Sequence, residues 1–209
     1  MRKQGVLLVV AGPSGVGKGT IINRIIERNP EVRCSVSCTT RAPRPGEVDG
    51  RDYYFVSVEE FHRMREQGEL LEWALVHQDL LYGTPRKPVE EALERAEDLI
   101  LEIDYQGARS LRQALGDRAT LVFVAPPRWQ DLVDRLHGRS TEDDEATKKR
   151  LGSAIHEFAY VELFEYLIIN EDLEQAVSQL EAILKSERQR LKRLDWEPFI
   201  EGLLRDAGH

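Results

Sequence analysis

The sequence is poor in cysteine and has no repeats or low-complexity segments. Its two cysteines, Cys34 and Cys38, lie four residues apart on an expected strand. That spacing would separate their Cα atoms by about 13 Å, which is too far for a disulfide. No further residues of zinc-ligand spacing accompany them. We therefore expect two small buried side chains, a reducing compartment and a cytoplasmic protein.

Long apolar runs and an excess of basic residues are also missing. No run reaches the roughly 18–20 residues that cross a bilayer. The apolar residues 5–11 lead into a glycine loop, which indicates a strand and not a signal peptide. The net charge is −8, whereas nucleic-acid-binding domains usually carry a basic excess. We expect neither a membrane nor a nucleic-acid partner, although a local basic pocket for a small polyanion remains compatible with this charge.

Short apolar runs alternate with segments of helical periodicity. Strands buried on both faces are expected at residues 6–11, 99–103, 121–125 and 167–169, and helices at residues 20–28, 89–96, 108–115 and 128–136. This alternation implies βαβ crossovers and predicts an α/β fold with a mostly parallel sheet flanked by helices. A length of 209 residues favours one domain with inserted lobes.

Two stretches interrupt the alternation. Residues 36–84 are strand-like and rich in turns, with one helix at residues 58–67 that Ser57 could cap, and we expect an inserted lobe there. Residues 135–155 include a polar, charged run that is typical of a mobile lid.

The remaining segments would form the core of one domain. That domain is expected to span residues 4–188, with its core at about residues 4–35, 85–128 and 165–194 and a C-terminal tail at residues 195–209. An apolar stripe that begins at Leu173 is interrupted by Glu187. The interruption favours a helix packed on the core over a coiled-coil dimer. Both a monomer and a homodimer remain compatible with the sequence.

A glycine-rich segment follows the first expected strand and opens the first expected helix. It comprises Gly12, Pro13, Ser14, Gly15, Val16, Gly17, Lys18, Gly19 and Thr20. Here backbone N–H groups can converge on phosphate oxygens at a helix N-terminus, and Lys18 can reach the β- and γ-phosphates of ATP. Gly19 stands where the usual pattern has a Ser or Thr ligand of Mg²⁺. We therefore expect Mg²⁺ to be held by phosphates and waters, with Thr20 and Asp104 as candidates for contact through water.

Four further motifs resemble guanylate kinases, in the order found in that family. They are residues 37–55, residues 71–74, residues 82–85 and residues 102–107, and the whole resemblance runs from about residue 5 to residue 172. It implies an enzyme of purine nucleotide metabolism that transfers the γ-phosphoryl group of ATP to GMP, and to dGMP, with Mg²⁺ as cofactor.

The resemblance also implies the residues that bind GMP. The phosphate would be held by Arg41, Arg44, Tyr53 and Tyr82, and the chemistry agrees, because arginine makes bidentate bonds to phosphate. Glu72 could accept from guanine N1–H and the 2-amino group, an edge that adenine lacks, while Ser37 and Thr84 could donate to O6. The set is completed by Glu102, Asp104 and Gly107. Asp104 would contact GMP or order the waters of Mg²⁺, or it would instead cap the following helix.

The polar run resembles the lid of the same family. Arg135, Arg139 and Arg150 are expected to act with Lys18 and Arg41 on the charge of the transferred phosphoryl group. Thr141 and Asp144 predict a capping box. No histidine lies in a motif that would supply a general base, and the ionised GMP phosphate needs none. Asn170 lies where the adenine site of the family would be.

Two other functions stay open. The chain could be a P-loop kinase of another small phosphorylated substrate, or a guanylate-kinase-like module that binds phosphorylated peptides without turnover. Glu72 with Ser37 and Thr84 argues against the first, because a sugar presents no guanine edge. The intact glycine loop argues against the second.

Overall fold

The computed structural model describes residues 3–76, 80–137 and 144–207. Within these ranges the strands are β1 (Leu7–Ala11), β2 (Val32–Cys34), β3 (Cys38–Thr39), β4 (Tyr54–Phe55), β5 (Leu70–Val76), β6 (Leu80–Pro85), β7 (Asp98–Glu102), β8 (Ala119–Ala125) and β9 (Tyr166–Ile169). The α-helices are α1 (Lys18–Arg28), α2 (Val58–Glu66), α3 (Arg86–Glu94), α4 (Tyr105–Leu115), α5 (Trp129–His137), α6 (Asp144–Phe158), α7 (Leu173–Arg188) and α8 (Glu197–Asp206). Short 3₁₀ turns are η1 (Gly116–Arg118), η2 (Val161–Leu163) and η3 (Leu191–Arg193).

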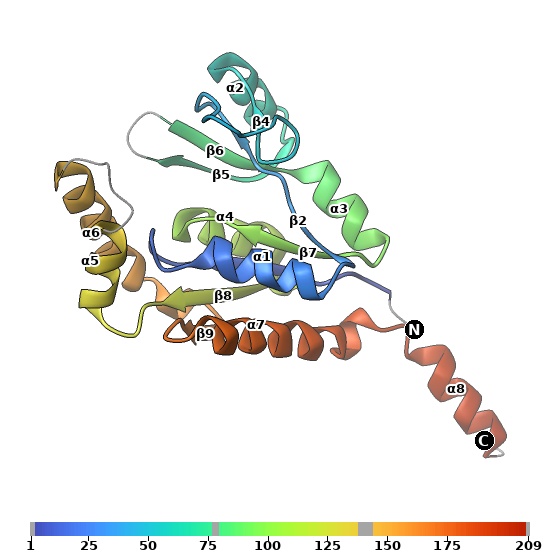
Figure 1. Cartoon of the computed structure of the whole chain (residues 1–209). Coiled ribbons are helices and arrows are strands. Elements are labelled where there is room, and N and C mark those ends of the chain that lie inside the picture. The colour runs from blue at the N-terminus through green and yellow to red at the C-terminus, as the bar shows by residue number, and fades with distance from the viewer. Residues whose placement is uncertain (1–2, 77–79, 138–143, 208–209) are drawn as a thin grey trace.

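The main sheet has the strand order β2-β7-β1-β8-β9, and every neighbouring pair in it is parallel (Figure 1). Successive residues of β1 point to opposite faces. Leu8 and Val10 pack with α1 and α7, whereas Leu7 and Val9 pack with α3 and α4. Burial on both faces explains the apolar run, and the expected α/β fold is confirmed.

One expected strand differs in its burial. In β9 only Ile168 is buried, while Leu167 and Ile169 are 55% and 52% exposed. The expectation that this strand is covered on both faces is wrong, because β9 is the edge strand of the sheet. Ile168 faces the cluster formed with α1 and α7, and its two neighbours point to the opposite side.

A second, mixed sheet with the order β4-β3-β6-β5 forms a lobe together with α2 (Figure 1). Its own small core contains Phe61, Leu70 and Leu81. The Ser57 hydroxyl accepts from the Glu60 N–H at 3.1 Å, so the expected cap of α2 is confirmed. Leu71 packs with residues of α3 and α4 and thereby joins the lobe to the main sheet.

The cysteines are not the buried pair that the sequence predicted. Cys34 ends β2 of the main sheet and is exposed, whereas Cys38 begins β3 of the lobe and is buried. They lie on different strands of different sheets, because the chain leaves the main sheet between them.

Helix α7 packs on the core, as its apolar stripe predicted. Val177, Leu180 and Leu184 are fully buried beside α1 and the sheet. The stripe does not continue, because α7 ends at Arg188 and Leu191 is 65% exposed. Across the described parts of the chain, no helix is both long and apolar enough to pass through a bilayer. The domain, lobe and lid bounds stay predictions.

Candidate active site

A cavity of about 580 Å³ lies between the glycine loop, the lobe and α6. The expected residues that line it are Gly12, Ser14, Gly15, Gly17, Lys18, Gly19, Thr20, Ser37, Tyr53, Glu72, Tyr82, Glu102, Asp104 and Arg150. It includes the carboxyl edge of β7, where open parallel sheets bind ligands. Its volume is that of a small-molecule site.

The glycine loop is shaped around the N-terminus of α1. Gly17 is the N-cap of that helix with φ 99°, and a Cβ there would lie 2.5 Å from Nδ2 of Asn170. Only glycine suits this position. Lys18 Nζ donates to the carbonyls of Gly12 at 2.6 Å and Pro13 at 3.2 Å, and lies 4.0 Å from Oε1 of Glu102. The ammonium therefore lies over its own loop, beside the helix end that favours anions.

Two residues that were expected to contact ATP form hydrogen bonds to the backbone of this loop. Asn170 Nδ2 donates to the Val16 carbonyl at 2.7 Å. Arg135 donates to the same carbonyl at 3.3 Å and to the Asn170 carbonyl at 2.9 Å. Neither side chain lines the cavity. Both side chains bond to the backbone here, and their expected contacts with ATP stay predictions.

Arg139 and Thr141 lie outside the described residues, as do the expected capping box and residues 77–79. Arg150 of α6 lines the cavity.

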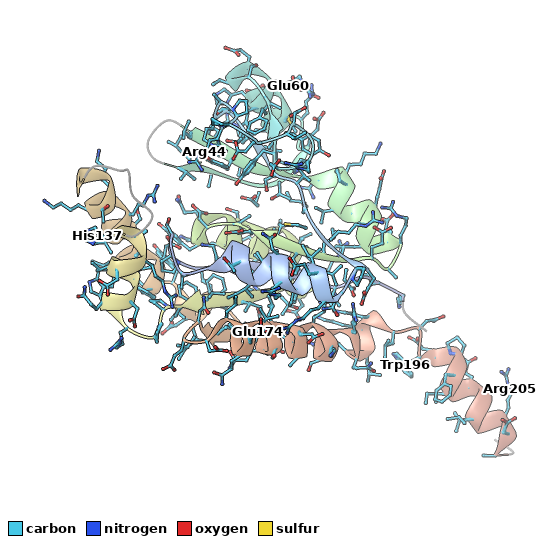
Figure 2. The ribbon with its side chains drawn as sticks, viewed as in Figure 1. Arg44, Glu60, His137, Glu174, Trp196 and Arg205 are labelled. Carbon is cyan, nitrogen blue, oxygen red and sulfur yellow. The ribbon has the colours of Figure 1, made fainter. Side chains whose placement is uncertain are left out.

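The expected phosphate-binding arginine Arg41 is paired with a carboxylate. Its Nη2 donates to both oxygens of Glu47, at 2.8 and 2.9 Å, and its guanidinium lies 5.5 Å from the centre of the Tyr53 ring. The Arg41 bond lowers the pKa of Glu47. The Arg44 N–H donates to the same carboxylate at 2.7 Å, and the Arg44 residue is exposed on the lobe (Figure 2). Glu47 thus occupies the guanidinium that a phosphate would need, a role that the sequence reasoning missed.

Glu72 lies on β5 at the lobe side of the cavity and is 5% exposed. Thr84 donates to its Oε1 at 2.6 Å, and Gly107 packs so closely that a Cβ would lie 2.6 Å from Oε2. Burial raises the pKa of Glu72 to about 7, although the Thr84 bond lowers it. Thr84 is fully buried and does not line the cavity. Its hydroxyl orients Glu72 here, and its expected direct contact with a base stays a prediction.

Asp104 caps α4, which was one of the two roles expected for it. Its Oδ1 accepts from the Gly107 N–H at 2.8 Å, and Gln106 Nε2 donates to Oδ2 at 3.3 Å. Asp104 also lines the cavity, with Glu102 from the end of β7. The cap aligns α4 so that Gly107 meets Glu72.

Comparison with known proteins agrees with this geometry. The guanylate kinase family model matches residues 4–187. The chain belongs to the guanylate kinase family. The guanylate kinase of Bradyrhizobium diazoefficiens is 44% identical over 204 residues, which cover 97% of this chain and 93% of that protein. The guanylate kinase of Carboxydothermus hydrogenoformans is 46% identical over 199 residues, covering 95% and 97%. A crystal structure of guanylate kinase from Anaplasma phagocytophilum has a TM-score of 0.79 and 34% identity, with coverage of 95% of this chain and 94% of that one.

In this member of the guanylate kinase family, α6 adds a carboxylate that the sequence reasoning missed. Glu157 lines the cavity and is 8% exposed, and its Oε2 finds no hydrogen-bond partner among the described residues. Burial raises its pKa to about 7; Lys18 lowers the pKa and Asp104 raises it. In the sequence Glu157 is one charge among many in a polar segment. Only the packing of α6 against the phosphate loop distinguishes it.

His156 of α6 also lines the cavity. It belongs to no sequence motif, so sequence reasoning did not place it at the site. Its neighbour in the chain is Glu157, and both reach the cavity because α6 ends beside it.

Proposed function

We propose that this chain transfers the γ-phosphoryl group of ATP to GMP, giving ADP and GDP. Family membership supports the reaction. The observation that carries the choice of acceptor is Glu72, a buried carboxylate in the same cavity as the phosphate loop. A phosphate loop by itself indicates only a nucleotide. A buried hydrogen-bond acceptor opposite the phosphate loop selects a base that presents two hydrogen-bond donors, as guanine does and adenine does not.

Binding of GMP would exchange partners at Arg41. The phosphate replaces Glu47 as the bidentate acceptor of the guanidinium, and the hydroxyls of Tyr53 and Tyr82 donate to the remaining oxygens. Arg44 is exposed on the same lobe and supplies a second guanidinium. The Tyr53 and Tyr82 rings already lie 5.9 Å apart at the cavity. Arg41 and Arg44 do not line the cavity, so both guanidinium groups would have to turn toward the bound phosphate.

At the other end of GMP, Glu72 accepts from N1–H and the 2-amino group. Thr84 and Gly107 fix the carboxylate for this contact, and Ser37 on the cavity wall donates to O6. These groups contact the base and the phosphate and not the ribose. Because dGMP differs from GMP only in the ribose, it should be accepted as well. Glu102 and Asp104 lie between the two sites.

In the transfer itself, an oxygen of the GMP phosphate forms a bond to the γ-phosphorus while the bond from the γ-phosphorus to the bridging oxygen of ADP breaks. Lys18 exchanges its loop carbonyls for β- and γ-phosphate oxygens, and Arg150 approaches as α6 closes. Catalysis then rests on positioning and on charge stabilisation. Closure of α6 would also keep water from the reacting phosphate.

The residues present fit a magnesium ion held mainly by ATP. Among the described residues, no group of three or more His, Cys, Asp or Glu side chains is placed to hold a metal. Thr20, Glu102 and Asp104 all line the cavity, and side chains that carry oxygen atoms suit contacts to the waters of Mg²⁺. When bound, the ion neutralises charge on the phosphates. We propose these contacts, and a cytoplasmic location, as parts of the same function.

A coupled assay of ADP formation tests the proposal. ATP is supplied with GMP, dGMP, AMP, UMP or CMP in separate reactions. We expect turnover with GMP and dGMP only. Equal turnover with AMP or a pyrimidine monophosphate would refute the assignment of Glu72, and no turnover with any acceptor would favour a binding module.

A further inference from the structure

Hydrogen bonds hold the segment before α8 against the core. Arg193 in η3 is 1% exposed and donates to the Gly5 carbonyl at 3.0 Å and to Oε2 of Glu187 at 3.3 Å. Glu187 is itself 2% exposed and accepts from the Thr120 hydroxyl at 2.9 Å. The Lys3 N–H donates to the Arg193 carbonyl at 2.9 Å. The chain is therefore held against the amino-terminal ends of the central strands β1 and β8 immediately before α8 begins.

Helix α8 itself projects away from the body of the molecule (Figure 1). All of its residues are described, and none of them is buried. Figure 2 shows Trp196 at its base and Arg205 near its far end, both clear of the core. The family match ends at residue 187, before η3 and α8. Helix α8 therefore lies outside the part of the chain that the family model matches, and it follows the segment that Arg193 holds against the core.

One broad face of α8 is apolar. The exposed fractions are 36% for Trp196, 53% for Phe199, 39% for Ile200, 50% for Leu203 and 49% for Leu204. Their spacing of three and four residues places them along one side of the helix. An isolated helix of this length is marginal in water, and Gly202 weakens it further. Contiguous exposed apolar surface of this kind marks an interaction site.

We propose that α8 pairs with α8 of a second copy of this chain, and that this antiparallel pair is the contact of a twofold dimer. The five side chains expose about 500 Å² per copy, so pairing would bury about 1,000 Å² in total, near the lower limit for a specific interface. A twofold axis brings the same apolar face of both copies together. The proposal concerns assembly and is independent of the proposed phosphotransfer.

The charges of α8 support this occupant. Glu197 and Glu201 lie in its first half, and Arg205 lies in its last turn. An antiparallel pair brings Glu197 and Glu201 of each helix beside Arg205 of the other, which is followed by Asp206, and it opposes the two helix dipoles favourably. Three carboxylates against one guanidinium give the helix a net negative charge. That charge disfavours an anionic lipid surface, which attracts basic amphipathic helices.

Sedimentation velocity of the full-length chain, from 1 to 100 µM, tests the pairing. We expect a reversible dimer. Leu203→Glu would place a carboxylate at the centre of the pair and should weaken the dimer at least about 100-fold. The matched control is Leu167→Glu, which changes an equally exposed leucine on β9, away from α8 in Figure 1, and should leave the dimer intact. Phe199→Ser provides a second interface variant that adds no charge.

Several results would overturn the proposal. They are a monomer at all concentrations, a dimer that survives both α8 variants, and a dimer that Leu167→Glu abolishes. Binding of a monomeric chain to phosphatidylcholine–phosphatidylglycerol vesicles would identify a lipid surface as the occupant instead. Circular dichroism of each variant verifies folding. Because GMP-dependent ADP formation is measured separately, failure of the dimer and failure of the proposed function are distinguishable.

Discussion

Replacing Glu72 with glutamine tests the guanine site with the smallest change of shape. The amide keeps an acceptor for the Thr84 hydroxyl, which donates at 2.6 Å, but turns the second oxygen into a donor. It can no longer accept from both N1–H and the 2-amino group. We expect kcat/KM for GMP to fall by about 2–4 kcal/mol, which is about 30- to 1,000-fold. For AMP we expect no loss, because the amide can donate to adenine N1.

The same variant should be more stable than the wild type above neutral pH. Burial raises the pKa of Glu72 from 4.5 to about 7, so ionising this group in the folded state costs about 3 kcal/mol relative to the unfolded chain. Glutamine has no such cost. At pH 8 the free energy of unfolding should therefore rise by up to about 3 kcal/mol, whereas at pH 4 the difference should vanish.

Two measurements decide the matter. Steady-state kinetics with GMP and AMP give the change in acceptor preference, and urea denaturation at pH 4 and pH 8 gives the change in stability. Thr84→Val is the matched control, because it removes the hydroxyl that orients the carboxylate and leaves both acceptor oxygens. A Glu72→Gln variant that keeps the wild-type preference for GMP would refute the reasoning. In that case Glu72 would be a buried strand residue, and the base would be read elsewhere.

Three further predictions follow from the described contacts. Lys18→Met should lower kcat at least about 10²- to 10³-fold while GMP affinity, measured by calorimetry, stays nearly unchanged; parallel loss of both would contradict separate sites. Folding raises the pKa of Glu157 from 4.5 to about 7, so the folded chain holds more protons in that window and the free energy of unfolding falls as pH rises through it. Glu157→Gln should remove part of this fall in urea denaturation between pH 4 and pH 8, and an unchanged slope would show that Glu157 stays ionised. Arg193→Met removes the buried guanidinium that bonds Oε2 of Glu187 at 3.3 Å, while Arg190 still donates to the same oxygen at 3.3 Å. Loss of this charge-assisted bond should destabilise the chain by about 1.5–3 kcal/mol with kcat intact at 20 °C; a loss below about 1 kcal/mol in denaturant titration would mean that Arg190 compensates.

The sequence alone determined the main sheet and the phosphate loop, and it identified Glu72 as the proposed selector of the base. Strands of the main sheet are buried on both faces, so their apolar runs are local signals that need no partner to be recognised. The glycines before Lys18 are also local, because Gly17 must adopt a positive φ at the start of α1. Glu72 was identified through a motif, and its burial agrees with the role that the motif implies.

Only the tertiary structure decided what surrounds these residues. Arg135 and Asn170 meet Val16 from positions 119 and 154 residues away, so no local pattern could show that they bond to the loop backbone. Glu157 is buried at the cavity beside the phosphate loop, which no local pattern around it could show.

The exposure of β9 and of α8 also depended on the tertiary structure. An apolar residue has the same pattern in a central strand and in an edge strand, and only the strand order left Leu167 and Ile169 uncovered. The sequence of α8 is amphipathic, but its direction depends on the buried bond between Glu187 and Arg193. The physical reason is common to these cases: local sequence sets which conformations are favourable, whereas burial and charge depend on residues far away in the chain.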